Sequence, residues 1–484
     1  MRLHPARLLE SLRASYWFVP SLMVLVAGAL AVLMPWLDSR LSLGPGGTFG
    51  WIAQTQTDGA RTVLGVIAGS VIGVAGTTFS ITMVAVSFAS ANFGPRLIAN
   101  FMRDRGNQVT LGTFIATFVY CLLVLRRVHG AAGDDASVSY EAFVPHLSVL
   151  VALALALASV GVLIYFIHHV PETIDVDRLV ASIGRELRRS VGELFPDPDG
   201  ARRGLPTGRD GRGGGEGGGR DGTAPPGAPG PPTWDERVAG RTLVRVSSGD
   251  AGYVQALELE RLAEIAAGHD LLVRVRHRPG DFVIDSDAVL DVWPDAGTGA
   301  PPVRELRDCF ALGERRTARQ NSTFLAEQLV EVIGRALSPG TNDPFTAIAC
   351  LDWLKGALVE FMEREGEADR LDATLPVRAR PIDFEHFVAV VFDSTRQYVC
   401  GDRNVALHAL QTLVDVAARA PRAEHRAALV RRMDELLAAS REAMTGPEGA
   451  DDVAARHAEG MRLLLDPDAR EAARHGQGWL GGRA

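Results

Sequence analysis

Residues 62–90 read TVLGVIAGSVIGVAGTTFSITMVAVSFAS, and none of them is charged. The uncharged run continues as far as Pro95. Roughly 20 helical residues cross a hydrocarbon core of about 30 Å, so this run is more than long enough. Because so long an apolar segment has no stable place in water, we expect it to form a membrane-spanning helix.

Three further apolar segments flank this one. We expect spans at about residues 17–36, 109–127 and 147–168, with tryptophans at the ends of the first, where amphipathic rings favour the membrane interface. The first segment resembles a signal peptide in its basic leader. Its apolar run is too long, however, and no small-residue cleavage site precedes Asp38, so we interpret it as an uncleaved anchor. Residues 1–170 are therefore predicted to form a four-helix transmembrane bundle.

The arginines set the expected orientation, because cytoplasmic loops carry an excess of positive charge. They gather in the N-terminal tail, between the second and third segments, and after the fourth. The opposite side is poorer in arginine and richer in acids, although the Arg126-Arg127 pair opposes this balance. We expect a multi-pass protein of the bacterial inner (plasma) membrane with both termini in the cytoplasm.

Small residues form a stripe along the second segment. At about 100° per residue they fall within one arc of the helix. Glycine weakens a helix by about 1 kcal/mol relative to alanine, so this many glycines need a structural reason. Close packing within the bundle or between subunits is one reason, because small residues let helices approach closely in lipid. Lining a pore is the alternative. The stripe consists of Gly65, Gly69, Gly73, Gly76, Ser80 and Ser87.

The residues behind the membrane segments divide into four parts. Residues 171–194 have apolar side chains at helical spacing between arginines, as in a juxtamembrane amphipathic helix. Residues 195–233 are rich in glycine and proline and are predicted to be a disordered linker. Residues 234–297 favour a small α+β module. Residues 303–466 favour an α-helical cytoplasmic domain, so the fold class expected for the whole chain is mainly α.

One joint in the helical domain is well defined by its sequence. A proline-glycine pair ends one helix, and a capping residue followed by proline begins the next, because proline suits the first helical position. We call this joint the structural elbow. It consists of Pro339, Gly340, Asn342, Asp343 and Pro344.

Composition narrows the possible functions. The net charge of −8 argues against nucleic-acid binding. The scattered cysteines form no C-x-x-C pair, so neither a zinc site nor a disulfide framework is expected. The β module has a proline-glycine turn, a strand, a short gap and a further strand, an order that resembles biotinyl and lipoyl domains. Its hairpin lacks the lysine that carries those groups, so no cofactor is expected. Common phosphate-binding, zinc-protease and serine-hydrolase motifs are absent, and we expect neither a catalytic nor a metal-binding residue.

Several short motifs resemble those of a known family. They are FSIT at 79–82, FGPR at 93–96, LGTF at 111–114, GYVQ at 252–255 and RALSPGTNDP at 335–344. The chain resembles the bacterial predicted-membrane-protein family called domain of unknown function 2254, from about Leu8 to Leu465 apart from the linker. This resemblance implies a membrane location. It implies no activity and no catalytic or binding residue.

Two hypotheses about function follow. In the first, a non-enzymatic protein forms a homo-oligomer through the second helix and acts as a channel or transport-like assembly with a regulatory cytoplasmic domain. In the alternative, the bundle anchors a scaffold or sensor whose helical domain binds a cytoplasmic protein partner. The lipid bilayer is a partner in both, and nucleic acid is a partner in neither.

Overall fold

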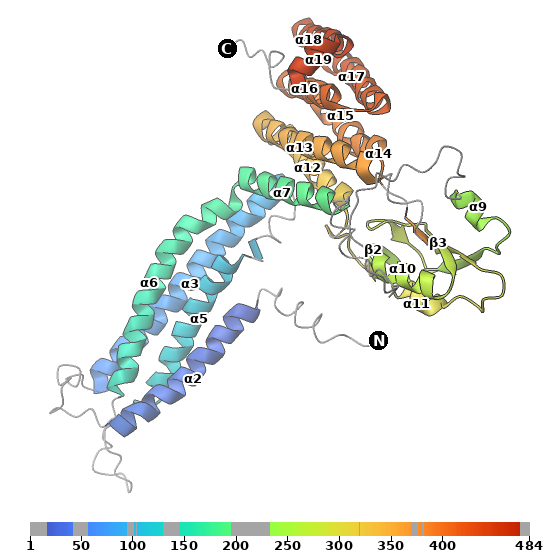
Figure 1. Cartoon of the computed structure of the whole chain (residues 1–484). Coiled ribbons are helices and arrows are strands. Elements are labelled where there is room, and N and C mark those ends of the chain that lie inside the picture. Colours follow the sequence, from blue (N-terminus) through green and yellow to red (C-terminus); the bar gives the residue numbers. More distant parts are fainter. Residues whose placement is uncertain are drawn as a thin grey trace, which may run out of the picture. The chain divides into compact units, whose positions relative to one another are not determined.

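The computed structural model describes residues 17–41, 57–93, 101–102, 104–128, 145–194, 233–318, 320–368, 376–379 and 382–474. It is mainly helical, and four of its helices are long and apolar enough to cross a membrane (Figure 1). The expected linker at 195–233 falls outside the described residues, apart from its last residue. The four candidate spans are the helices α2 (Phe18–Leu41), α3 (Thr57–Phe93), α5 (Arg105–Leu125) and α6 (His146–Ile174).

Each of the four helices corresponds to an expected span, but their ends differ. Helix α3 begins at Thr57 rather than near residue 62, and α6 continues to Ile174 rather than ending near 168. The expected bounds followed the uncharged run, whereas the helices continue through charged residues such as Asp58 and Glu172. Hydropathy measures the apolar segment, and the helix itself extends past it because backbone hydrogen bonding does not stop at the interface.

Small side chains let the four helices pack closely. The bundle core includes Ala27, Ala31, Ala60 and Ala68 together with the fully buried Tyr120. Gly112 of α5 marks the closest approach to α2, because a Cβ added there would lie 3.2 Å from the Cα of Pro20 and 2.5 Å from the sulfur of Met23. The motif glycine at this position is therefore explained by helix packing.

The amphipathic helix after the bundle is α7 (Val176–Leu194). It begins later than the expected residue 171, because α6 continues through Pro171 and ends at Asp175, whose backbone is extended. The apolar face of α7 is covered by protein: Leu187 and Val191 are fully buried. Helix α13 (Pro344–Ala368) lies against it, with Trp353 packed over Gly184.

This contact predicts that a residue larger than glycine at position 184 destabilises the protein. A Cβ added there would lie 2.3 Å from the Trp353 ring, so we expect Gly184→Ala to destabilise the packing of α7 on α13 by about 1–3 kcal/mol. Gly192→Ala in the same helix is the control, because its Cβ would meet nothing closer than 3.6 Å. Thermal unfolding followed by circular dichroism measures the difference, and equal effects of the two substitutions would contradict this packing.

Two small sheets form the β-containing region. One has the strand order β1-β5-β3-β7 and the other β4-β2-β6, and β7 runs parallel to β3. The strands are β1 (Val244–Ser247), β2 (Gly252–Leu257), β3 (Leu271–Val275), β4 (Phe282–Val283), β5 (Ala288–Pro294), β6 (Phe310–Gly313) and β7 (Val377–Arg378). Short helices α9 (Trp234–Val238), α10 (Leu259–Gly268) and α11 (Val303–Arg307) accompany them.

The sheets extend beyond the expected module at 234–297. Strands β6 and β7 come from the range 303–466, which the sequence pattern suggested to be helical. They have 4 and 2 residues, too few to show a periodicity of their own. Their pairing with β2 and β3 is decided by tertiary contacts instead.

Helices make up the rest of the described chain. The first of them after the short α11 begins at Ser322, because the Asn321 side chain caps it and Gln320 has a left-handed backbone with φ of 55°. The Gln320 side-chain oxygen accepts a hydrogen bond from the backbone amide of Leu257 in β2 at 2.9 Å, and the Gln320 side-chain nitrogen donates to the Leu257 carbonyl at 3.2 Å. Besides α13, the helices are α12 (Ser322–Ala336), α14 (Phe384–Val388), the π-helical turn η2 (Ala389–Asp393), α15 (Ser394–Val399), α16 (Arg403–Arg419), α17 (Ala423–Ala443), α18 (Pro447–Leu465) and α19 (Pro467–Arg474).

Candidate functional site

The small-residue stripe of α3 lies on a face that the other described helices leave uncovered. A Cβ added at any of its glycines would meet no atom within 4 Å. The neighbouring face of α3 instead buries Leu64, Ala68, Ala75 and Val86 in the bundle. Among the described helices of one chain, these glycines therefore do not mark positions of close helix approach. The exposed stripe residues are Gly65, Gly69, Gly73, Gly76, Ser80 and Ser87.

Hydrogen bonds connect the spanning helices near their ends and also in the interior of the bundle. The Asp38 carboxylate, at the end of α2, accepts hydrogen bonds from the backbone of Leu147 and Ser148 at 2.9 and 3.1 Å, and from the Ser148 hydroxyl at 2.8 Å. Deeper in the bundle, the hydroxyls of Thr117 and Ser159 lie 3.1 Å apart. Asp38 thus caps the first turn of α6, whose exposed amide groups attract negative charge.

A histidine–carboxylate pair joins α5 to α6 near the other end. His169 Nε2 lies 2.9 Å from Asp104 Oδ1, and Tyr165 stacks on the imidazole with ring centroids 5.0 Å apart. Asp104 also caps α5 by accepting a hydrogen bond from the backbone of Asn107. Sequence reasoning missed this pair, because 65 residues separate its members and each is an ordinary polar residue at a helix end.

The elbow residues form a tight turn between α12 and α13. The Asn342 backbone is left-handed, with φ of 47°, and its amide donates to Ser338. Pro344 opens α13, and the Asp343 carboxylate accepts hydrogen bonds from the amide and hydroxyl of Thr346 at 3.2 and 2.6 Å. Pro339 and Gly340 lie exposed at the outside of the turn. These contacts explain why capping residues stand here.

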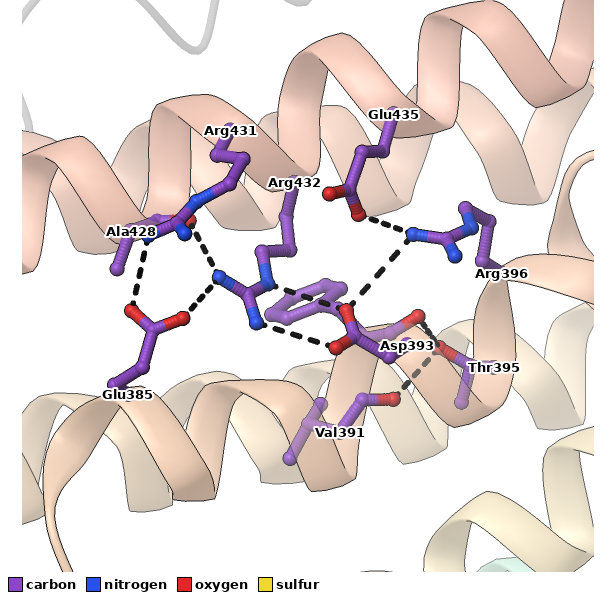
Figure 2. Close-up of polar contacts among 10 residues, drawn as sticks. Glu385, Val391, Asp393, Thr395, Arg396, Ala428, Arg431, Arg432 and Glu435 are labelled. Carbon is purple, nitrogen blue, oxygen red and sulfur yellow. Dashed lines mark hydrogen bonds and ion pairs between the residues drawn. The ribbon is translucent and has the colours of Figure 1, made fainter.

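A buried ion-pair network joins η2 and α14 to α17 (Figure 2). Arg432 is only 7% exposed, and its guanidinium donates to both oxygens of Asp393 at 3.1 and 3.2 Å. A further nitrogen lies 2.5 Å from Glu385, which Arg431 also contacts. The two side chains that pair with the buried guanidinium are both acids, and they are partly exposed, at 39% for Asp393 and 47% for Glu385.

The environment of Arg432 keeps it charged. Burial alone would lower its pKa, but hydrogen bonds to Asp393 and Glu385 outweigh burial and raise the pKa above its usual value. The π-helical turn ends at Asp393, and the Thr395 hydroxyl bonds the Val391 carbonyl at 2.8 Å within this distorted segment. π-helical turns are rare and frequently occur at functional sites. Here the turn ends at Asp393, which hydrogen-bonds Arg432.

The described residues show no group of three or more His, Cys, Asp or Glu side chains arranged to hold a metal ion. The acids around His386 have other roles: Asp383 caps α14 through the His386 amide, and Glu385 pairs with Arg432. The buried thiols of Cys309 and Cys400 have raised pKa values because burial disfavours the thiolate, which makes them poor nucleophiles.

Comparison with known proteins identifies the family of the chain. The model of the family described as "Predicted membrane protein (DUF2254)" matches residues 13–415. The chain belongs to the DUF2254 family. Among curated relatives, an uncharacterized protein of Mycobacterium tuberculosis and one of Mycobacterium bovis are each 31% identical over 348 residues, covering 70% of this chain. The matched region spans 59% of the length of those relatives. No solved structure matches the chain.

This DUF2254 member is a membrane protein with four candidate spans. The stripe and the elbow, which the sequence singled out, are local features that the structure places on α3 and between α12 and α13. The ion pairs of Asp104 and Arg432 escaped sequence reasoning. Charged residues on the polar side of an amphipathic helix look alike whether they face water or a partner helix.

Proposed function

We propose that this DUF2254 protein works as a membrane-embedded oligomer whose copies pack along the stripe of α3. The observation that supports this proposal is the open space over Gly65, Gly69, Gly73 and Gly76. Four glycines in one helix cost about 1 kcal/mol each relative to alanine. A face that met only lipid would gain nothing in return, whereas a second helix can approach a glycine face closely.

The proposed activity is that of a channel or transport-like assembly, not that of an enzyme. Within one chain, the bundle core is filled by side chains such as Tyr120, Cys121 and Val124, all fully buried. A path for a solute would therefore run between protomers. In the described spans, charged residues stand only near the helix ends, so an ion-coupled carrier with a buried relay is not what we propose.

We place the assembly in the inner (plasma) membrane with both termini in the cytoplasm, on the strength of the arginine distribution. The cytoplasmic region is then a regulatory domain. Helix α7 supports this role, because it begins one residue after α6 and packs against α13 through Gly184.

Purified protein in liposomes tests the proposal. We expect the wild type to be oligomeric and to release a trapped small ion or solute, and we expect Gly69→Leu to abolish both properties because the isobutyl group prevents close helix approach. Gly161→Leu in α6 is the matched control: that glycine also has nothing within 4 Å of an added Cβ, yet it lies outside the stripe. It should leave both properties unchanged.

Two results would count against parts of the proposal. Oligomers that survive Gly69→Leu would show that the stripe is not the interface. Liposomes that contain intact wild-type oligomers but release no trapped ion or solute would contradict the channel and favour the second candidate, a membrane-anchored sensor or scaffold. The packing of α7 on α13 favours that candidate as well, because α7 follows the last membrane helix in the sequence and contacts the helical domain.

A further inference from the structure

A basic pocket lies between α7 and α13. It is a shallow surface pocket of about 330 Å³ that is widely open to solvent. Pockets that hold small ligands typically enclose about 300–1,000 Å³, so the space suffices for a phosphate group with a small substituent. The lining consists of Arg188, Arg189 and Gly192 from α7 with Glu360 and Arg364 from α13.

Two of the arginines are held in place by one carboxylate. Glu360 accepts a hydrogen bond from Nε of Arg188 at 3.0 Å and another from Nη2 of Arg364 at 3.1 Å. Arg364 also donates to the Gly192 carbonyl at 3.4 Å. Each guanidinium retains N–H donors beyond these contacts, because arginine carries five of them. The pocket is therefore pre-organised for an acceptor.

The third arginine has no such contact. Arg189 is exposed and makes no hydrogen bond or ion pair with the part of the chain that the structure describes. Three guanidinium groups thus share one carboxylate, which leaves the lining positively charged. Planar guanidinium groups match the oxygens of a phosphate and bind them through paired hydrogen bonds.

The place of the pocket in the chain indicates the source of the phosphate. Helix α7 begins one residue after α6, and Arg188 and Arg189 follow its first residue by roughly 20 Å of helical rise. Juxtamembrane arginines attract anionic lipids. The apolar side chains of α7, such as Leu187 and Val191, are buried in protein, so lipid would meet the arginines of this helix and not its apolar face.

We propose that this pocket binds the phosphate group of an anionic phospholipid. Arg188 and Arg364, positioned by Glu360, hold the phosphate oxygens, and Arg189 supplies the charge that no acid neutralises. The proposal does not depend on oligomerisation through α3. It rests on the membrane location and on the contacts of α7 with α13.

Native mass spectrometry of the full chain in detergent tests the site. The probes are phosphatidylglycerol, zwitterionic phosphatidylcholine, glycerol phosphate and inorganic phosphate. We expect phosphatidylglycerol to bind more tightly than the other three. We expect Arg189→Glu to weaken it by about tenfold or more, because a charge-assisted contact is replaced by repulsion. Arg185→Glu, also exposed on α7 but outside the pocket, is the control and should change the affinity less than twofold.

Arg364→Gln is a second variant, and it should also weaken phosphatidylglycerol binding. Circular dichroism on each variant shows whether the total helix content is retained. Equal affinity of wild type and Arg189→Glu would overturn the proposal, as would an equal loss in Arg185→Glu, which would indicate only a general charge effect. Inorganic phosphate or glycerol phosphate binding as tightly as the lipid would overturn the lipid as the source.

Discussion

Asp393→Ala is expected to lower the free energy of unfolding of the helical region by about 3 kcal/mol. The substitution leaves the buried guanidinium of Arg432 without the carboxylate that accepts two of its hydrogen bonds. Glu385 remains but contacts only one nitrogen, Nη1. A cation that is 7% exposed cannot recover its hydration without local unfolding, so most of the lost interaction appears as lost stability.

Replacing the cation Arg432 itself should lower the free energy of unfolding by less than Asp393→Ala does. In Arg432→Met, Asp393 still has Arg396 and Glu385 still has Arg431. The two acids are also 39% and 47% exposed, so water can hydrate them, while the methionine fills the buried space. Glu435→Gln serves as the control, because that acid and its partner Arg396 are both about one-third exposed, and such pairs contribute about 1 kcal/mol or less.

Hydrogen exchange of amides in α14 and α17 measures these changes in the full-length protein. The expected order of destabilisation is Asp393→Ala, then Arg432→Met, then Glu435→Gln. An Arg432→Met variant that is less stable than Asp393→Ala would contradict the view that a stranded buried charge is the main cost.

The second large effect concerns Asp38. We expect Asp38→Ala to destabilise the transmembrane bundle by about 2–4 kcal/mol, because the backbone amides of Leu147 and Ser148 and the Ser148 hydroxyl all lose their acceptor. The Asp38 side chain is 8% exposed, so little water reaches these donors. The lost charge also removes a favourable interaction with the start of α6.

Asp58→Ala is the matched control for Asp38→Ala. Asp58 also lies at the end of a spanning helix, in the first turn of α3, but it is exposed. Unfolding in mixed micelles with increasing SDS compares the two variants. Similar losses in both would mean that Asp38 acts only as a surface charge and that its hydrogen bonds to α6 do not hold the bundle together.

The sequence predicted the parts of this protein that local rules govern. The spans follow from apolar length, and the start of α13 at Pro344 follows from the capping residue before it. The strands β1 to β5 fall within residues 234–297, for which the sequence favoured a small α+β module. In each of these cases the signal lies within about ten residues of the structure that it specifies.

Features made by distant segments were not predictable in the same way. Strand β7 has 2 residues and exists only because β3 offers its edge, and the pocket on α7 needs Glu360 and Arg364, which lie more than 160 residues further along the chain. The stripe of α3 is intermediate. Its periodicity is local, but which face of α3 it occupies relative to the bundle emerged only from the packing of Leu64, Ala68 and Val86.

The mass of the complex extracted from membranes in native-like nanodiscs tests self-association through α3 most directly. A protein that assembles through its glycine face should give a mass that is a whole multiple, two or greater, of the 51.8 kDa chain, and Gly69→Leu should reduce it to a single copy. A wild-type mass of one chain, at the concentrations found in the membrane, would contradict the proposed assembly.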